Sequence, residues 1–130
     1  MNNLFLTRKG SLFALIASFL FVVNGCVKED DPPVINVSQN EICISQKSSA
    51  VSVWIDSNAE WKSSTNQEWC RPSVTTGRHS QEINVLVDEN TTKFNRTAII
   101  TFETKGGNKK TTSVLVSQEG IDVWGKGETN

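Results

Sequence analysis

From residue 34 onward, apolar and polar side chains alternate with a period of two, and no stretch shows an amphipathic pattern of helical length. The alternation is clearest over residues 51–56, where Val51, Val53 and Ile55 share one face of the predicted strand. The opposite face then carries Trp54 with its polar neighbours along the strand. This pattern predicts strands packed on one face and open to solvent on the other.

Further short strands are expected wherever β-branched and aromatic residues cluster between turn residues. The predicted strands are residues 34–37, 42–44, 51–56, 60–64, 69–71, 83–87, 97–104 and 112–118. Glycines and an asparagine between the last two permit the positive φ of a hairpin loop. Seven or eight short strands at regular spacing are typical of a two-sheet sandwich. The sequence therefore predicts an all-β fold over residues 34–120, an immunoglobulin-like antiparallel β-sandwich of about seven strands.

The N-terminal segment has the pattern of an export signal. Arg8 and Lys9 precede an apolar run over residues 12–23, which is too short for a membrane-spanning helix. We therefore expect residues 1–25 to be a cleaved signal peptide. Residues 23–26, Val-Asn-Gly-Cys, resemble a bacterial lipobox, which implies that Cys26 is diacylated and becomes the mature N-terminus. An ordinary signal peptide with an incidental cysteine is the alternative.

Residues 26–33 form a charged stretch that ends in two prolines, as expected of an extended tether. The acidic run directly after Cys26 resembles the surface-export signal of lipoproteins in the Bacteroidetes, although a solvated linker has the same composition. The expected location is the outer membrane, lipid-anchored and surface-exposed. Residues 121–130 are polar and glycine-containing, and we expect a frayed tail there.

Removal of residues 1–25 changes the charge balance of the remaining 105 residues. Thirteen basic residues become eleven against fourteen acidic ones, so the net charge moves from −1 to −3. A nucleic-acid partner is not expected, because nucleic-acid binding calls for a strongly basic face. Membrane association is instead expected from lipid, since two or more acyl chains anchor a protein stably.

The sequence shows no recognisable catalytic or metal-binding pattern. His79, the only histidine, lies in a polar loop, so neither a Ser-His-Asp triad nor a multi-histidine metal site is expected. The carboxylates fall in turns or on outward positions, where they are expected to be solvated. There is no phosphate-binding glycine loop and no Cys-x-x-Cys pair. We therefore expect no cofactor, no metal and no enzymatic activity.

An ordered set of motifs resembles one known family. The motifs are residues 57–61 (Ser-Asn-Ala-Glu-Trp), 69–70 (Trp-Cys), Gly77, Asn90 followed by Arg96, and 114–118 (Val-Leu-Val-Ser-Gln). Their order and spacing resemble the BACON family (Bacteroidetes-associated carbohydrate-binding often N-terminal). Cys70 and Pro72 depart from the usual residues of that family, and the loop around Gly77 is shorter.

The resemblance implies an immunoglobulin-like module of surface lipoproteins and glycoside hydrolases, with carbohydrate, glycan or mucin, as its ligand. Polysaccharide-utilisation proteins are the implied partners. A spacer or adhesion domain that binds no glycan is the alternative, and a small hydrolase is a third. Trp61 and Trp69 are expected in the core, because a sandwich this poor in aliphatic residues needs large buried side chains. Arg96 and Gln118 are expected to hold backbone groups at strand ends.

Trp54 is the predicted ligand-facing aromatic, with Asp56 beside it and Trp124 of the tail as a further candidate. An outward indole near a carboxylate offers a sugar both a stacking face and a hydrogen-bonding group.

A disulfide between Cys43 and Cys70 would stabilise the fold by roughly 3.5 kcal/mol, because it would close a loop in the unfolded chain. The alternation around Cys43 argues against pairing, because it turns that thiol away from the core. The sequence is compatible with both the paired and the unpaired state.

Overall fold

The computed structural model describes residues 31–122 of the 130-residue chain. The chain divides into two compact units, Met1–Asp31 and Pro32–Asn130, and the second unit contains all the strands described below. The predicted signal peptide, the lipidation site Cys26 and the tail residue Trp124 lie outside the described residues, so those predictions stand untested. Residues 31–34, at the end of the predicted tether, form no regular element.

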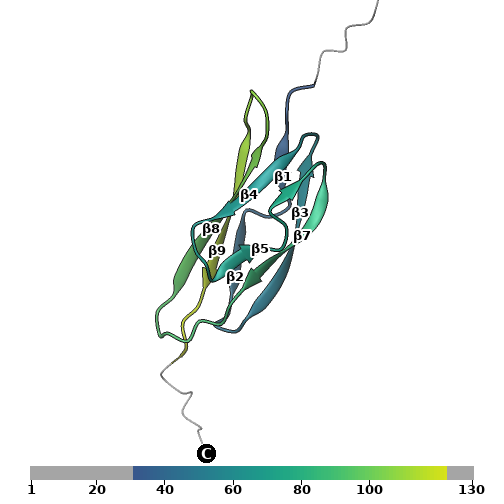
Figure 1. Cartoon of the computed structure of the whole chain (residues 1–130). Helices are drawn as coiled ribbons and strands as arrows, with labels where there is room; N and C mark the ends of the chain where they lie inside the picture. The colour runs from purple at the N-terminus through teal and green to yellow at the C-terminus, as the bar shows by residue number, and fades with distance from the viewer. Residues whose placement is uncertain (1–30, 123–130) are drawn as a thin grey trace, which may run out of the picture. The chain divides into compact units, whose positions relative to one another are not determined.

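Two stacked β-sheets build the domain (Figure 1). The first sheet has the strand order β1-β3-β7-β5, and the second has the order β2-β9-β8-β4-β6. The strands are β1 Ile35–Val37, β2 Glu41–Ile44, β3 Ser49–Ser57, β4 Trp61–Thr65, β5 Cys70–Pro72, β6 Thr76–Gly77, β7 Gln81–Val87, β8 Arg96–Thr104 and β9 Thr111–Gln118. This confirms the predicted all-β sandwich.

One strand pair departs from the antiparallel expectation. After β1, the chain crosses from the edge of the first sheet to the edge of the second, where β2 pairs parallel to β9. All the other pairs are antiparallel within residues 31–122. A parallel edge strand requires partners far apart in sequence, and here Ile42 lies opposite Val116. Local periodicity carries no information on such a pairing.

The inner faces of both sheets supply the apolar core. Alternation along β3 buries Val53 and Ile55 as predicted, with Val51 partly buried. Trp61 is fully buried and meets Phe102 edge to face, with the ring centroids 5.8 Å apart. The Trp61 indole N–H donates to the His79 carbonyl at 3.0 Å, so the buried ring leaves no polar group unpaired.

A buried polar network closes the end of the sandwich at which β9 ends. The Gln118 amide donates to the carbonyls of Gln46, Lys47 and Asp88 at 3.0–3.3 Å, and its oxygen accepts from Arg96 Nε at 2.8 Å. Arg96 Nη2 also donates to the Asp88 carbonyl at 2.9 Å. One side chain thus joins loops from both sheets, which confirms the structural role expected of Arg96 and Gln118.

Trp69 is only partly buried, in contrast to Trp61. It packs against the edge of the core, and the Arg96 guanidinium carbon stacks 4.1 Å from the centroid of its ring. No helix long and apolar enough to cross a membrane is present between residues 31 and 122.

Candidate functional site

The candidate site is the outward face of β3 and β7, two adjacent antiparallel strands of the first sheet. Trp54 projects from β3, and 49% of its surface is exposed. The strand register places Trp54 directly opposite Glu82 and Ser52 opposite Asn84, with all four side chains exposed. Asp56 follows Trp54 on the same face of β3. The outward direction predicted for Trp54 and Asp56 is therefore correct.

Hydrogen bonds order the polar side chains around the indole. The Ser52 hydroxyl donates to Glu82 Oε1 at 2.7 Å, and the Ser80 hydroxyl lies 2.9 Å from Asp56 Oδ1. These contacts orient two carboxylates next to Trp54, one across the strand pair and one further along β3. Neither carboxylate has an ion-pair partner within the described part of the chain.

The crossing from β1 to β2 fixes the backbone beneath the indole. Ser38 N–H donates to the Trp54 carbonyl at 2.9 Å, and Trp54 N–H donates to the Ser38 hydroxyl at 3.0 Å. Gln39 Nε2 donates to the Ser52 carbonyl at 3.0 Å. The backbone of Trp54 is thus hydrogen-bonded on both sides of its strand. Because this backbone is already ordered, little conformational entropy is lost there when a ligand binds.

The chemistry of this face suits a ligand that has hydroxyl groups and also an apolar ring face. An open indole face can stack on the C–H side of a sugar ring, while carboxylates and an amide accept or donate hydrogen bonds to hydroxyls. Three hollows of the described surface lie elsewhere: one of about 480 Å³ beside Cys43, one of about 590 Å³ at Arg78 and His79, and one of about 630 Å³ at Trp69. Trp54 lines none of these three.

The two cysteines of the described domain are not brought together. Cys43 is exposed on β2 at the edge of the second sheet, whereas Cys70 is buried on β5 in the first sheet, and both thiols are free. Burial raises the pKa of the Cys70 thiol to about 11, which leaves it protonated and unreactive at neutral pH. The outward direction predicted for Cys43 is confirmed.

Most other carboxylates of the described domain are exposed or ion-paired. Asp88 holds Arg71 in a bidentate pair at 2.9 and 3.0 Å, and these hydrogen bonds lower the pKa of the Asp88 carboxyl. Glu103 lies 3.1 Å from the Lys109 ammonium and 3.3 Å from that of Lys62, and the two cations lower its pKa. His79 is exposed in its loop. Residues 31–122 contain no cluster of three His, Cys, Asp or Glu side chains able to hold a metal.

Glu82 and Asn84 were not predicted as site residues from the sequence, although both lie on the outward face of β3 and β7 beside Trp54 and Ser52. Their outward direction follows from the alternation of β7, but their position opposite Trp54 and Ser52 depends on the pairing register of two strands far apart in the chain. An acidic residue at an outward strand position gives no signal of its own in the sequence.

Comparison with known proteins identifies the domain. Residues 59–119 match the family model BACON, described as "Putative binding domain, N-terminal". The chain is 33% identical over 95 residues to the xyloglucan-specific endo-beta-1,4-glucanase BoGH5A of Bacteroides ovatus, an alignment that covers 73% of this chain. The chain spans only 19% of the length of that enzyme.

Solved structures agree with this relationship. The Bacteroides ovatus GH5 xyloglucanase, solved in complex with a XXXG heptasaccharide, superposes with a TM-score of 0.62 and 28% identity over 70% of this chain and 19% of the enzyme. The periplasmic chaperone SfaE superposes with a TM-score of 0.56 at 4% identity, covering 68% of this chain and 59% of its own, and it shares the fold alone. Within the β-sandwich, residues 59–119 thus form a BACON domain, related in sequence and structure to part of that xyloglucanase.

Proposed function

We propose that this chain is a lipid-anchored protein of the outer-membrane surface, in which the BACON domain binds carbohydrate through the outward face of β3 and β7. The half-exposed indole of Trp54, flanked by Asp56 and Glu82, is the observation that carries the proposal. Aromatic platforms with adjacent carboxylates bind the alternating apolar and hydroxylated surfaces of sugar rings. The relationship to a xyloglucan-specific glucanase makes xyloglucan the first ligand to test, followed by mucin glycans.

The anchor follows from the lipobox-like sequence that ends in Cys26. Acyl chains on this residue would hold the domain at the membrane without any contribution from the fold. A small domain with one binding face, fixed at the cell surface, is suited to retaining polysaccharide for enzymes carried by other proteins. The proposal therefore includes an accessory role in polysaccharide handling.

Affinity electrophoresis in gels containing xyloglucan or mucin tests the binding face. Trp54→Ala should abolish the retardation that the wild-type domain shows, while Trp54→Phe should keep part of it, because an aromatic face remains. Ile99→Ala is the matched control: Ile99 is 43% exposed and projects from the outer face of the opposite sheet. Retardation that survives Trp54→Ala would rule out this face as the binding site.

Stability measurements separate loss of binding from loss of fold. About half of the Trp54 surface is buried, which is roughly 125 Å², so its removal should cost at most about 3 kcal/mol of unfolding free energy at ~25 cal/mol per Å². Ile99→Ala should cost a similar amount or less. A domain that folds normally and binds none of the glycans tested would favour the spacer role instead.

The anchor has its own test. Cys26→Ser should abolish the incorporation of radiolabelled palmitate by cells that express the full chain, because the acylated sulfur is gone. Label that persists in the serine variant would show that Cys26 is not the lipidation site.

A further inference from the structure

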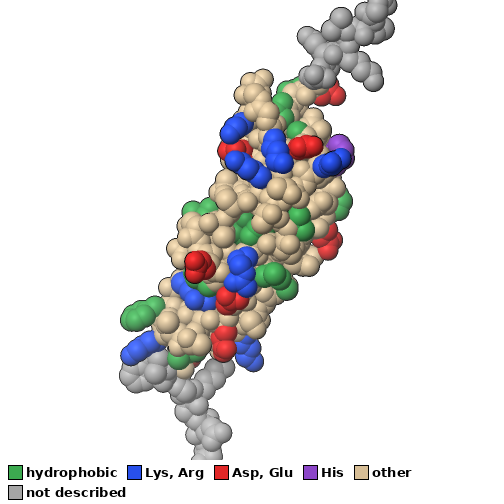
Figure 2. Space-filling view, in the orientation of Figure 1, with side chains coloured by type: hydrophobic (Ala, Val, Ile, Leu, Met, Phe, Trp, Pro, Cys, Tyr) green, Lys and Arg blue, Asp and Glu red, His purple; other side chains and the backbone are tan. Residues whose placement is uncertain are grey.

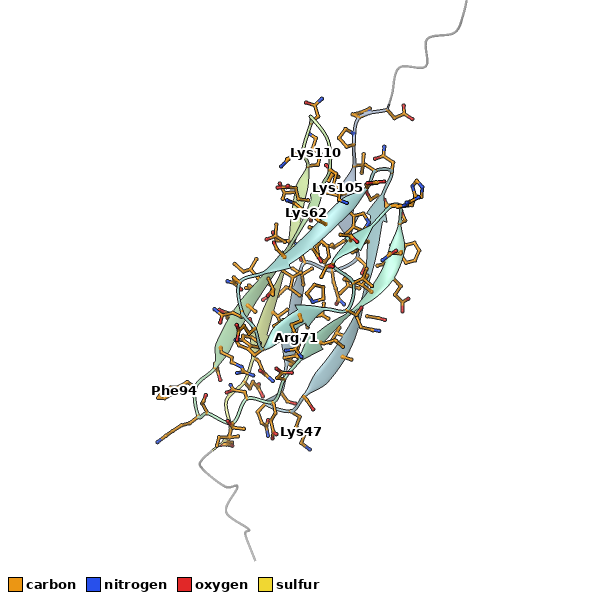
Figure 3. The ribbon with its side chains drawn as sticks, in the orientation of Figure 1. Lys47, Lys62, Arg71, Phe94, Lys105 and Lys110 are labelled. Carbon is orange, nitrogen blue, oxygen red and sulfur yellow. The ribbon has the colours of Figure 1, made fainter. Side chains whose placement is uncertain are left out.

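Positive charge collects at one end of the sandwich, although the described domain as a whole is acidic. Five exposed cations form this "basic end": Lys62 on β4, Arg78 in the loop before β7, and Lys105, Lys109 and Lys110 in the β8–β9 hairpin. Figure 3 shows Lys62, Lys105 and Lys110 together at this end, whereas Lys47 and Phe94 mark the other end. Blue side chains gather over the same region in Figure 2.

The acidic residues nearby do not cancel this charge. Lys105 pairs with Glu60 at 3.8 Å, and Lys62 and Lys109 share Glu103. Arg78 and Lys110 have no ion-pair partner within residues 31–122.

Counting charges shows how uneven the distribution is. Even with Asp31 at the chain entry and Asp56 included, the basic end has five cations against four carboxylates. Residues 31–122 contain nine Lys and Arg against eleven Asp and Glu, so the rest of the described domain has four cations against seven carboxylates. The charge of the sandwich is therefore unevenly distributed along its length.

The polypeptide enters the domain at this same end. The Asn58 amide donates to the Pro32 carbonyl at 3.0 Å, and Val34 N–H donates to the Asn58 oxygen at 2.7 Å. Two residues further on, the Glu60 carbonyl accepts from Lys105 N–H at 2.7 Å. The β3–β4 turn thus binds both the incoming chain and the basic hairpin.

The distance from the proposed anchor to this entry point is short. Residues 27–31 separate Cys26 from Pro32, and six peptide units span at most about 20 Å when fully extended. A domain tied to a bilayer through this segment presents its entry end to the lipid headgroups. Electrostatic attraction acts over about 8 Å at physiological salt, within the range that such a tether allows.

We propose that the basic end contacts anionic phosphate groups of the membrane that holds the lipid anchor, which orients the domain with its Lys47 and Phe94 end outward. This rests on the lipidation of Cys26 in the proposed function. Cationic side chains next to a membrane attachment point add to its affinity in proportion to their number. The orientation leaves the Trp54 face directed sideways, open to polysaccharide beside the cell. An acidic polysaccharide is the competing occupant of the basic end, and the position of the chain entry favours the membrane.

Co-sedimentation with vesicles tests the contact separately from the anchor. The protein is residues 26–130 with Cys26→Ser, which keeps the acidic run of the tether and whose fold is verified by a cooperative thermal transition. Vesicles contain either phosphatidylcholine alone or phosphatidylcholine with 30% phosphatidylglycerol, at low and at physiological salt. We expect binding to the anionic vesicles only, weakening as salt rises.

Charge reversal locates the contact. Arg78→Glu with Lys110→Glu should lower the partition onto anionic vesicles about 20-fold or more. Lys47→Glu with Lys93→Glu is the matched control, because it makes the same change in net charge at exposed sites of the opposite end, where Figure 3 shows Lys47 and Phe94, the chain neighbour of Lys93. The control pair should bind within about twofold of wild type.

Three outcomes would overturn the proposal: no preference for anionic vesicles, equal losses in the two charge-reversed pairs, or binding to polygalacturonate that depends on Arg78 and Lys110 without vesicle binding. Trp54→Ala should leave vesicle binding unchanged. Failure of the glycan site and failure of the basic end are therefore distinguishable, and palmitate labelling reports on the anchor independently.

Discussion

Gly77 of β6 lies where any larger residue would collide with Trp61, a fully buried aromatic of the domain. A Cβ added at Gly77 would stand 2.3 Å from Trp61 Cζ2, 2.4 Å from Cε2 and 2.7 Å from Nε1. Carbon atoms in contact need about 3.5 Å, so the ring or the β6 backbone would have to move by about 1 Å. Trp61 has little freedom to move, because it packs edge to face on Phe102 and its indole N–H is bonded to the His79 carbonyl.

Gly77→Ala should therefore destabilise the domain by about 2–4 kcal/mol, of which overpacking contributes about 1–3 and a weakened indole hydrogen bond about 1. For a domain of this size, each kcal/mol lowers Tm by roughly 4–8 °C, so we expect a drop of about 10–25 °C. Thermal unfolding followed by circular dichroism, together with urea titration, measures both quantities.

Gly107→Ala is the control for this substitution. Gly107 lies in the same half of the domain, within the β8–β9 hairpin, and an added Cβ there meets no atom within 4 Å. This variant should stay within about 0.5 kcal/mol of wild type. A loss below about 0.5 kcal/mol in Gly77→Ala would show that β6 moves away freely, and the argument from a rigid Trp61 would be wrong.

Three further predictions concern the network, the thiols and the ion pair. Gln118→Ala should cost about 2–4 kcal/mol in urea unfolding, because a buried amide with four hydrogen bonds is lost and its partners are left unpaired; a cost under 1 kcal/mol would contradict this. In a domain without Cys26, an aromatic disulfide reagent at neutral pH should modify one thiol, Cys43, in the folded state and both Cys43 and Cys70 in denaturant; two fast thiols in the folded state would refute the burial of Cys70. The lowered pKa of Asp88 means that its pairing stabilises the fold above the unfolded pKa near 3.9, and that this contribution is lost as pH falls through the folded value. Asp88→Asn should therefore flatten the acid limb of the stability profile, and an unchanged limb would show that the exposed pair contributes nothing measurable.

Alternation alone was enough to assign faces along single strands. It turned Val53 and Ile55 inward, and it turned Trp54 and Cys43 outward, as the structure has them. This succeeds because side chains on an extended strand must point alternately to opposite faces, whatever the strand pairs with. The hairpin turn behaved likewise: Gly106 adopts a φ of +113°, a conformation that favours glycine.

The depth of burial of a side chain was predicted less well than its direction. Trp61 and Trp69 were both expected in the core, but Trp69 lies at its edge beneath the Arg96 guanidinium. Eight strands were predicted by position, including those at 34–37 and 42–44, and the structure adds a ninth, β6, a two-residue pairing with β4 in the segment around Gly77 that was expected to be a loop. Propensity is weak in such short elements, so tertiary contacts decide whether they form.

The sequence by itself determined the sandwich class and the direction of the Trp54 indole, because both follow from a period of two residues that each strand carries locally. Only the tertiary structure decided that Glu82 stands opposite Trp54, that β2 runs parallel to β9, and that cations from three separate segments gather where the chain enters the domain. Those arrangements depend on register and on crossings between sheets. They are set by the shared burial of two inner faces, a condition that no single segment contains.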